Sequence, residues 1–166
     1  GMITEFTIPT SGSGPNSITV GSDGNLWFTE YLGSKIGKIT TAGTITEFTT
    51  PTAGSAPNGI TTGLDGNVWF TEYAGNKIGR ITPAGVITEF TIPTANSQPT
   101  AITTGLDGNL WFTKYYGQSI GKITPAGVIT EFATTTGNGS APFGIVTTSD
   151  GNLWFTEKDG NKIGKI

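Results

Sequence analysis

The sequence predicts an all-β protein, a β-propeller built from four 42-residue blades of four strands each. Two observations lead to this fold class. "ITEF" begins at residues 3, 45, 87 and 129, a strict period of 42, and each copy contains four short strand-like segments separated by turn residues. Such a repeat is typical of propeller blades. No segment places apolar residues at helical spacing over three turns, so we expect essentially no helix.

The four elements of a blade can be followed in order in the first copy. "ITEFTIP" is rich in Ile, Thr and Phe, which favour strands, and it ends at a proline. "SITVGS" follows a loop of Gly, Ser, Pro and Asn, and "NLWFTE" follows an Asp-Gly-Asn turn. "SKIGKIT" leads into another Gly-containing turn. We expect all four to be strands, with "SITVGS" innermost and "ITEF" outermost in the blade.

The "LWF" segment favours a propeller over a sandwich. Successive side chains of a strand point to opposite faces, so three bulky apolar residues in a row cover both faces of the sheet. A sheet whose two faces are both covered by neighbouring sheets accommodates this pattern. The tryptophans are therefore predicted to be core residues, each burying roughly 150–250 Å². They are Trp27, Trp69, Trp111 and Trp154.

The phase of the strands defines one domain and leaves its closure open. The domain is expected to span 3–166, with repeats at approximately 3–44, 45–86, 87–128 and 129–166, and Gly1-Met2 is interpreted as a tag scar. The first "ITEF" is then an outer strand without its own blade, and the last repeat lacks one. Closure of four blades within one chain and exchange of this strand between two chains both fit a propeller. We favour the second, an eight-bladed ring formed by a homodimer.

The composition excludes several classes of function. The formal net charge is -3, only 13% of the residues are charged, and no run of Lys and Arg occurs, so neither nucleic acid nor a membrane is an expected partner. No apolar stretch is long enough for a membrane-spanning helix or a signal peptide. There is no cysteine and no histidine, which removes thiolate chemistry and the commonest general base.

The stretch "PNGITTGLDGNVWFTEYAGNKIGRITPAGVITEFTIPT" (57–94) resembles the repeat of virginiamycin B lyases, also called streptogramin lyases, and the resemblance covers nearly the whole chain. It implies a single-chain propeller enzyme of seven blades that opens type B streptogramin antibiotics by magnesium-dependent elimination at the ester bond. It also implies catalytic histidines directly after the proline that precedes the innermost strand, and a catalytic glutamate just before one such proline. Here the positions after the prolines hold Asn16, Asn58, Thr100 and Phe143, and those before them hold Gly14, Ala56, Gln98 and Ala141.

Three sets of residues are candidates for a site. The residues after the prolines form the main set of ligand-binding candidates, because the family places them at the mouth of the central channel. A second set consists of aromatic residues in the turn after the "WFT" strand, Tyr31, Tyr73, Tyr115 and Tyr116, joined by Lys158 in the last copy. The third set, Glu30, Glu72 and Glu157, could ring a cation; we interpret these glutamates as solvent-exposed strand ends, paired with Lys35, Lys77 or Lys162.

The sequence leaves three functions open. The first is a non-enzymatic binding or self-assembling propeller, which needs no cofactor. The second is a lyase-type enzyme with substituted groups, which would need magnesium and a carboxylate base. The third is a carbohydrate or peptide binder that uses the tyrosines. We favour the first, since no residue present fills the roles of the family's catalytic histidines.

Overall fold

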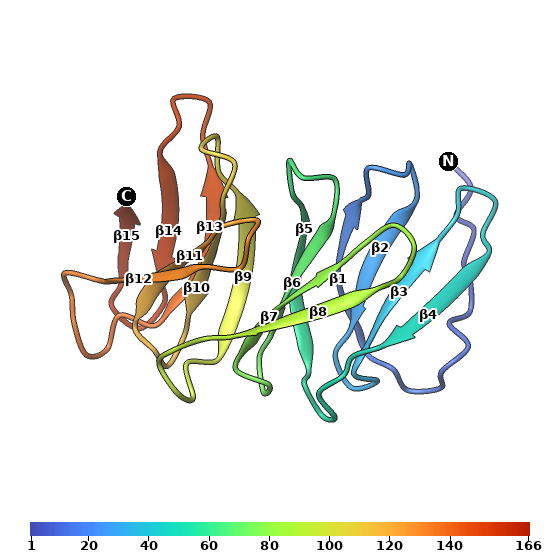
Figure 1. Ribbon diagram of the computed structural model, residues 1–166, viewed down its shortest axis with the longest axis horizontal. Helices are drawn as coiled ribbons and strands as arrows, with labels where there is room; N and C mark the ends of the chain where they lie inside the picture. Colours follow the sequence, from blue (N-terminus) through green and yellow to red (C-terminus); the bar gives the residue numbers. More distant parts are fainter.

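The computed structural model describes all 166 residues and contains fifteen strands in four antiparallel sheets. Each sheet is one blade, and its strands follow chain order from the innermost to the outermost (Figure 1). Blade 1 comprises β1 (Pro15–Val20), β2 (Leu26–Glu30), β3 (Lys35–Ile39) and β4 (Ile45–Thr49); blade 2 comprises β5 (Pro57–Thr62), β6 (Val68–Glu72), β7 (Lys77–Ile81) and β8 (Ile87–Thr91); blade 3 comprises β9 (Pro99–Thr104), β10 (Leu110–Lys114), β11 (Ser119–Ile123) and β12 (Ile129–Ala133); blade 4 comprises β13 (Pro142–Thr147), β14 (Leu153–Glu157) and β15 (Lys162–Lys165).

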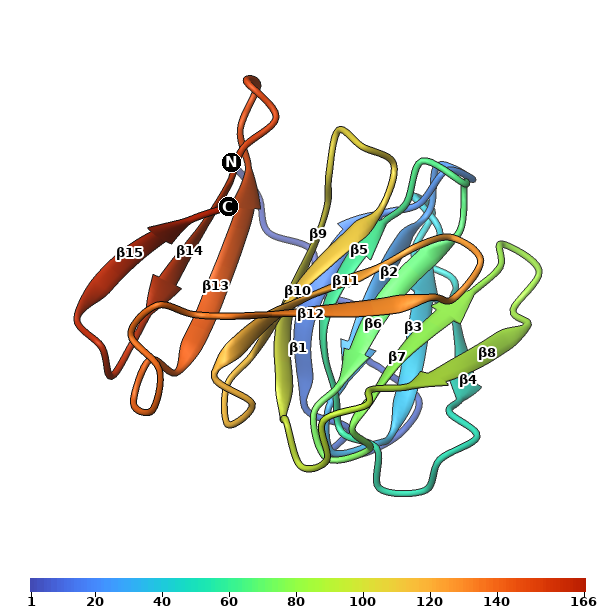
Figure 2. The ribbon, with the colours of Figure 1, turned by 60° about the vertical axis from the view of Figure 1, so that its left-hand side comes forward.

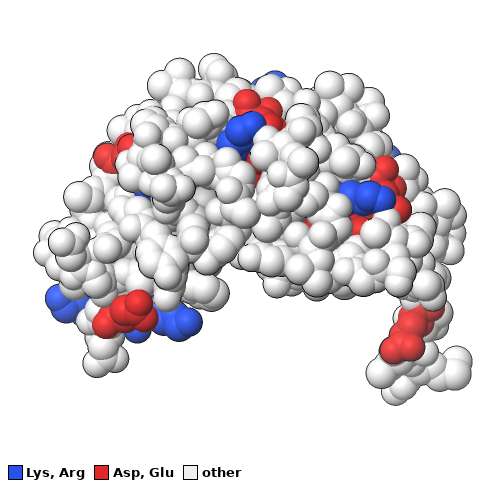
Figure 3. Space-filling view, turned by 90° about the horizontal axis from the view of Figure 1, so that it is seen from below, with Lys and Arg blue, Asp and Glu red and all other residues white.

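The four blades form an open arc and not a closed ring. Neighbouring inner strands contact one another in the order β1, β5, β9, β13, and the outer strands splay away from them (Figures 1 and 2). The molecule is an arch hollowed on one side (Figure 3), and the blades that contain β1 and β13 lie at opposite ends of the row of blades in Figure 1. The all-β propeller fold is thus confirmed as a half-propeller. Closure of four blades within one chain, which the sequence left open, is not adopted.

The first "ITEF" segment was expected to be a strand, and this is wrong for the isolated chain. The three later copies form β4, β8 and β12, each paired with the strand before it. Residues 3–6 form no strand because no third strand of a preceding blade lies beside them. At the other end of the arc, β15 pairs with β14 on one edge only, so its second edge is free.

The hydrophobic core consists of three separate clusters, one at each junction between blades. At the central junction, Trp69 and Ile78 of blade 2 pack against Leu110 and Phe112 of blade 3. The equivalent residues fill the other two junctions. The predicted core role is confirmed for Trp27, Trp69 and Trp111, whereas Trp154 is 40% exposed because no blade covers the outer face of blade 4.

Glycine in the third strand of each blade makes room for the aromatic core. A Cβ on Gly79 would lie 2.1 Å from Cζ of Phe70, and the same distance separates the equivalent pair Gly37 and Phe28. Any larger side chain would therefore displace the ring that fills the junction. The glycine of the "IGKI" pattern is therefore required for packing of the aromatic ring.

The regular secondary structure consists of strands alone, and no helix that could span a membrane is present.

The Asp-Gly-Asn turns that precede the second strands also anchor the tryptophans. Asp65 accepts hydrogen bonds from the backbone N–H of Asn67 at 3.1 Å and from the Asn67 side chain at 2.9 Å. It also accepts a bond from Trp69 Nε1 at 3.2 Å. The same carboxylate therefore shapes the turn and satisfies the one polar atom of the buried indole.

We expect Asp65→Ala to lower the free energy of unfolding by about 1–3 kcal/mol, because the indole N–H loses its partner inside the protein. Urea denaturation at fixed protein concentration measures this loss. The control is Asp159→Ala, which removes an exposed carboxylate and should change stability by less than about 0.5 kcal/mol. Equal effects of the two substitutions would contradict the anchoring role.

Candidate functional site

The hollow side of the arch contains a cavity at the ends of the inner strands. Its volume is about 530 Å³, and residues near the start of β1, β5, β9 and β13 line it. Each of these strands begins at a proline, so the residue after the proline occupies the same place in every blade. The structure therefore brings the whole set of residues after the prolines to this one cavity: Asn16, Asn58, Thr100 and Phe143.

Two of the predicted tyrosines join them. Tyr31 and Tyr73 line the cavity, with ring centroids 6.1 Å apart and ring planes tilted by 52°. Burial, and then the neighbouring Tyr31, raise the pKa of Tyr73 above its usual value. Tyr115 does not line the cavity itself; its ring meets Phe143 edge-on at 6.2 Å. Lys158 lies over both of these rings, 5.9 Å from Tyr115 and 5.5 Å from Phe143.

The polar groups of the cavity differ between its two halves. Asn16 donates through Nδ2 to Oδ1 of Asn58 at 2.7 Å, and the two amides retain further donor and acceptor capacity. Thr100 is buried and is committed to the protein, since its hydroxyl donates to the carbonyl oxygen of Phe143 at 3.1 Å. Amide groups beside aromatic rings are thus the chemistry that the cavity offers a ligand.

The glutamates that end the second strands were expected to be exposed, and this is wrong. Glu30, Glu72 and Glu157 are all buried, the first two completely. The turn after the strand is tied to the loop before the inner strand by bonds such as Gly75 N–H to the carbonyl oxygen of Ser55, at 3.1 Å. These tied loops enclose the carboxyl groups.

The lysines expected to pair with these glutamates pair with other carboxylates or with none. Lys35 contacts Glu47 at 3.3 Å and Lys77 contacts Glu89 at 2.6 Å. Glu47, Glu89 and Glu131 belong to the repeated "ITEF" segment, and the sequence did not predict them as site residues. Their recurrence opposite the third strand was the signal that could have found them.

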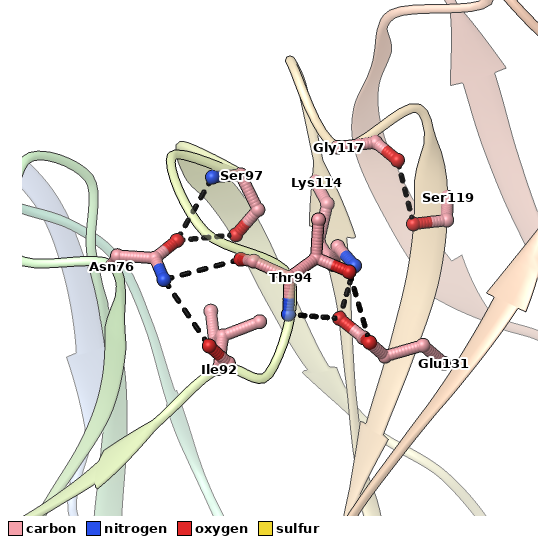
Figure 4. Close-up of polar contacts among 8 residues, drawn as sticks. All are labelled: Asn76, Ile92, Thr94, Ser97, Lys114, Gly117, Ser119 and Glu131. Carbon is pink, nitrogen blue, oxygen red and sulfur yellow. Dashed lines mark hydrogen bonds and ion pairs between the residues drawn. The ribbon is translucent and has the colours of Figure 1, made fainter.

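Blades 1 and 2 therefore each contain a pair of neighbouring carboxyl groups, Glu30 with Glu47 and Glu72 with Glu89. Burial, reinforced by the charge of Glu89, raises the pKa of Glu72 to about 8. Burial, together with Glu47, raises the pKa of Glu30 to about 7. The carboxyl oxygens of Glu30 and Glu72 are buried and none of them has a hydrogen-bond partner. In blade 3, Lys114 occupies the equivalent place and pairs directly with Glu131 (Figure 4).

The cavity does not fit magnesium, the ion that the family resemblance implies. Mg²⁺ in proteins is bound through carboxylates together with water or phosphate oxygens. None of the cavity-lining residues is acidic, and no group of three or more Asp, Glu, His or Cys residues gathers anywhere in the structure. Glu30 and Glu72, the carboxyls with raised pKa, lie outside the cavity lining.

The four antiparallel sheets, with their inner strands around one axial cavity, define half of a β-propeller. Residues 1–166 match the model of the virginiamycin B lyase family, and the chain belongs to that family. Virginiamycin B lyase from Staphylococcus aureus superimposes with a TM-score of 0.97 at 49% identity over the whole chain. A second structure of that enzyme, catalytically inactive and with quinupristin, gives the same values.

The matched relatives are longer than this chain. The chain spans 56% of the S. aureus lyase. Virginiamycin B lyase from Bacillus licheniformis is 50% identical over 41 residues, which make up 14% of that protein. A gluconolactonase from Xanthomonas campestris, at 16% identity and a TM-score of 0.72, shares the fold alone.

Proposed function

We propose that this chain is a non-enzymatic binding module of the lyase family, which holds an amide-containing, partly apolar ligand in the cavity of its inner strands. The observation that carries the proposal is the lining itself. The side-chain amides of Asn16, which is exposed, and of Asn58, which is half-buried, lie beside the rings of Tyr31 and Tyr73, within a volume of about 530 Å³. That volume is in the range of small-molecule sites, and amide groups pair well with the peptide bonds of a cyclic peptide.

The cavity offers no imidazole and no carboxylate for the elimination that the family resemblance implies. Abstraction of a proton from carbon needs a base positioned within hydrogen-bond reach of that proton. The positions where the resemblance implies histidine hold two amides, one hydroxyl and one phenyl ring, and the lining contains no carboxylate. These features favour binding without turnover.

A type B streptogramin is the ligand to test, because a relative of this fold has been crystallised with quinupristin. Calorimetric titration of the pure protein with quinupristin should give saturable binding. Chromatography of the same mixture, incubated with Mg²⁺, should recover intact quinupristin. Ring opening that scales with protein concentration would overturn the non-enzymatic proposal, and the absence of binding at saturating quinupristin would overturn the choice of ligand class.

Tyr73→Ala is expected to weaken quinupristin binding about tenfold, because the ligand loses one aromatic face of the cavity. The matched control is Tyr116→Ala, which removes an exposed tyrosine that does not line the cavity and should leave the affinity unchanged. Equal effects at the two positions would place the ligand elsewhere.

A glycan is the second candidate ligand. Tyrosine faces at an accessible rim stack well on sugar rings, and Tyr31 and Tyr73 lie side by side there. A glycan array probed with the wild type and with Tyr73→Ala distinguishes this class from cyclic peptides.

A further inference from the structure

We propose that Glu72 is a pH-operated latch for the turn 73–76, which carries Tyr73 into the ligand cavity. The neutral carboxyl group stabilises the closed turn, and loss of its proton favours opening. Glu72 is thus a positioning residue for Tyr73 and does not itself line the cavity. The consequence for a ligand rests on the proposed function, whereas the latch is tested on the free protein.

The carboxyl group of Glu72 is sealed between the turn 73–76 and the loop that precedes β5. Ala74 and Gly75 donate through their backbone N–H groups to the carbonyl oxygen of Ser55, at 3.0 and 3.1 Å. The turn lies directly on the carboxyl group, since a Cβ on Gly75 would be 2.6 Å from Oε2 of Glu72. Water therefore reaches the buried carboxyl group only when these bonds open.

The hydroxyls of the loop do not donate to Glu72. Thr50 and Ser55 are buried and bond to each other at 2.8 Å. The hydroxyl of Thr50 also lies 2.9 Å from the carbonyl oxygen of Ser34 and 3.1 Å from that of Thr52. It donates its one proton there, so it accepts the proton of Ser55. Both oxygens of Glu72 are left without a donor, and a buried carboxylate in that situation is strongly disfavoured relative to the neutral acid.

The charged groups that act on Glu72 also favour the neutral acid. They are Glu89 of β8 and Lys77 of β7, and the effect of Glu89 is the larger. Lys77 is committed to Glu89, 2.6 Å away. The loop 50–56, β5 and β9 contain no titratable residue, and the one titratable residue of the turn, Tyr73, lines the cavity. Burial, and then Glu89, accordingly raise the pKa of Glu72 to about 8.

Comparison with blade 3 shows that blade 2 has one carboxyl group too many. In blade 3, Lys114 ends the second strand, Ser119 begins the third, and Glu131 is on the fourth (Figure 4). The same positions of blade 2 hold Glu72, Lys77 and Glu89. Each blade therefore has one ammonium group for the carboxylate of its outer strand, and no cation remains for the second carboxyl group of blade 2.

The seal itself is the same in blade 3. Tyr116 and Gly117 donate through their backbone N–H groups to the carbonyl oxygen of Ser97, both at 3.1 Å. A Cβ on Gly117 would lie 2.6 Å from Cε of Lys114. The two turns thus cover different groups, an ion pair in blade 3 and an uncharged acid in blade 2. This makes the turn 115–118 an internal reference for the turn 73–76.

The direction of the pH effect follows from the two states of the turn. Under the closed turn the pKa of Glu72 is about 8, and in the opened turn, where water solvates the group, it returns to its ordinary 4.5. The stabilisation of the closed turn by protonated Glu72 is therefore fully present below about pH 4.5 and is lost as the pH rises through 8. Tyr73 N–H donates to the carbonyl oxygen of Ala56 at 3.1 Å as part of the same closure. Opening therefore displaces an aromatic wall of the cavity.

Hydrogen exchange of the free protein, measured by mass spectrometry of peptides that cover each turn, tests the latch. Relative to the turn 115–118, which shares the intrinsic pH dependence of exchange, the turn 73–76 should exchange about fiftyfold faster at pH 8 than at pH 6. Opening gains tenfold per pH unit between the two pKa values, and this gain is halved at pH 8, where half of the closed population is already ionised. Equal pH dependence of the two turns would overturn the proposal.

Three variants assign the effect to Glu72. Glu72→Gln keeps the shape of the neutral acid and should remove the fiftyfold difference. Glu72→Lys/Lys77→Ser gives blade 2 the residues of blade 3 and should remove it as well. Tyr73→Phe deletes the one ionisable group of the turn and should retain the difference. A difference that persists in Glu72→Gln, or disappears in Tyr73→Phe, would assign the titration to another group and contradict the latch.

The dissociation rate of quinupristin separates the latch from the proposed function. For the wild type, the rate should rise from pH 6 to pH 8 by a larger factor than for Glu72→Gln, because the ligand is released when the turn that carries Tyr73 opens. Failure to bind quinupristin at either pH, with the fiftyfold exchange difference intact, would reject the ligand class and support the latch. Binding without the exchange difference would reject the latch alone.

Discussion

Glu72→Gln is expected to stabilise the protein at pH 9 by about 4 kcal/mol and to have little effect at pH 4. Burial and the neighbouring Glu89 raise the pKa of Glu72 to about 8 in the folded protein, from 4.5 for the free group. The folded state therefore holds a proton that the unfolded state has lost between these values. The contribution of the protonated Glu72 to the free energy of unfolding is fully present below about pH 4.5 and is lost as the pH rises through 8. Gln keeps the shape of the neutral carboxyl and cannot ionise.

Urea denaturation at pH 4, 7 and 9, at one protein concentration, measures this effect. The two unfolding free energies should diverge steadily with pH. Asp159→Asn, which removes an exposed carboxylate, serves as the control and should follow the wild type throughout. Parallel curves for Glu72→Gln and the wild type would show that Glu72 is ionised in the folded protein at neutral pH.

Trp69→Ala is expected to lower the free energy of unfolding by about 3–5 kcal/mol. The indole is fully buried at the junction of blades 2 and 3, it stacks on Phe90 with centroids 5.7 Å apart, and Arg80 lies over it. Its removal leaves a cavity that the strands on both sides cannot fill. This loss is a large fraction of the roughly 5–15 kcal/mol that stabilises a typical domain.

The repeat offers a matched control in Trp154→Ala. This substitution should cost roughly half as much, because the ring of Trp154 already contacts water. Equal losses at both positions would contradict the open arc.

Prediction of the candidate site from the sequence was uneven, for physical reasons. Asn16, Asn58, Thr100 and Phe143 converge because each follows the proline that begins an inner strand, and a period in the sequence becomes a ring in space. The glutamates were misjudged because a strand end is exposed only when no loop crosses it. The bond from Gly75 to Ser55, which closes the loop over Glu72, joins residues twenty positions apart and leaves no local pattern.

The sequence by itself determined the blade: four segments with strand propensity, the turns between them, the order of the strands and the residues that fill each junction. It could do so because these features depend on local conformation and on a period of 42 residues. Only the tertiary structure decided that four blades leave an open arc, that "ITEF" at residues 3–6 forms no strand alone, and that Glu30 and Glu72 are buried with raised pKa values. These properties depend on the angle between blades and on loops that cover distant side chains, and both arise only when the blades pack together.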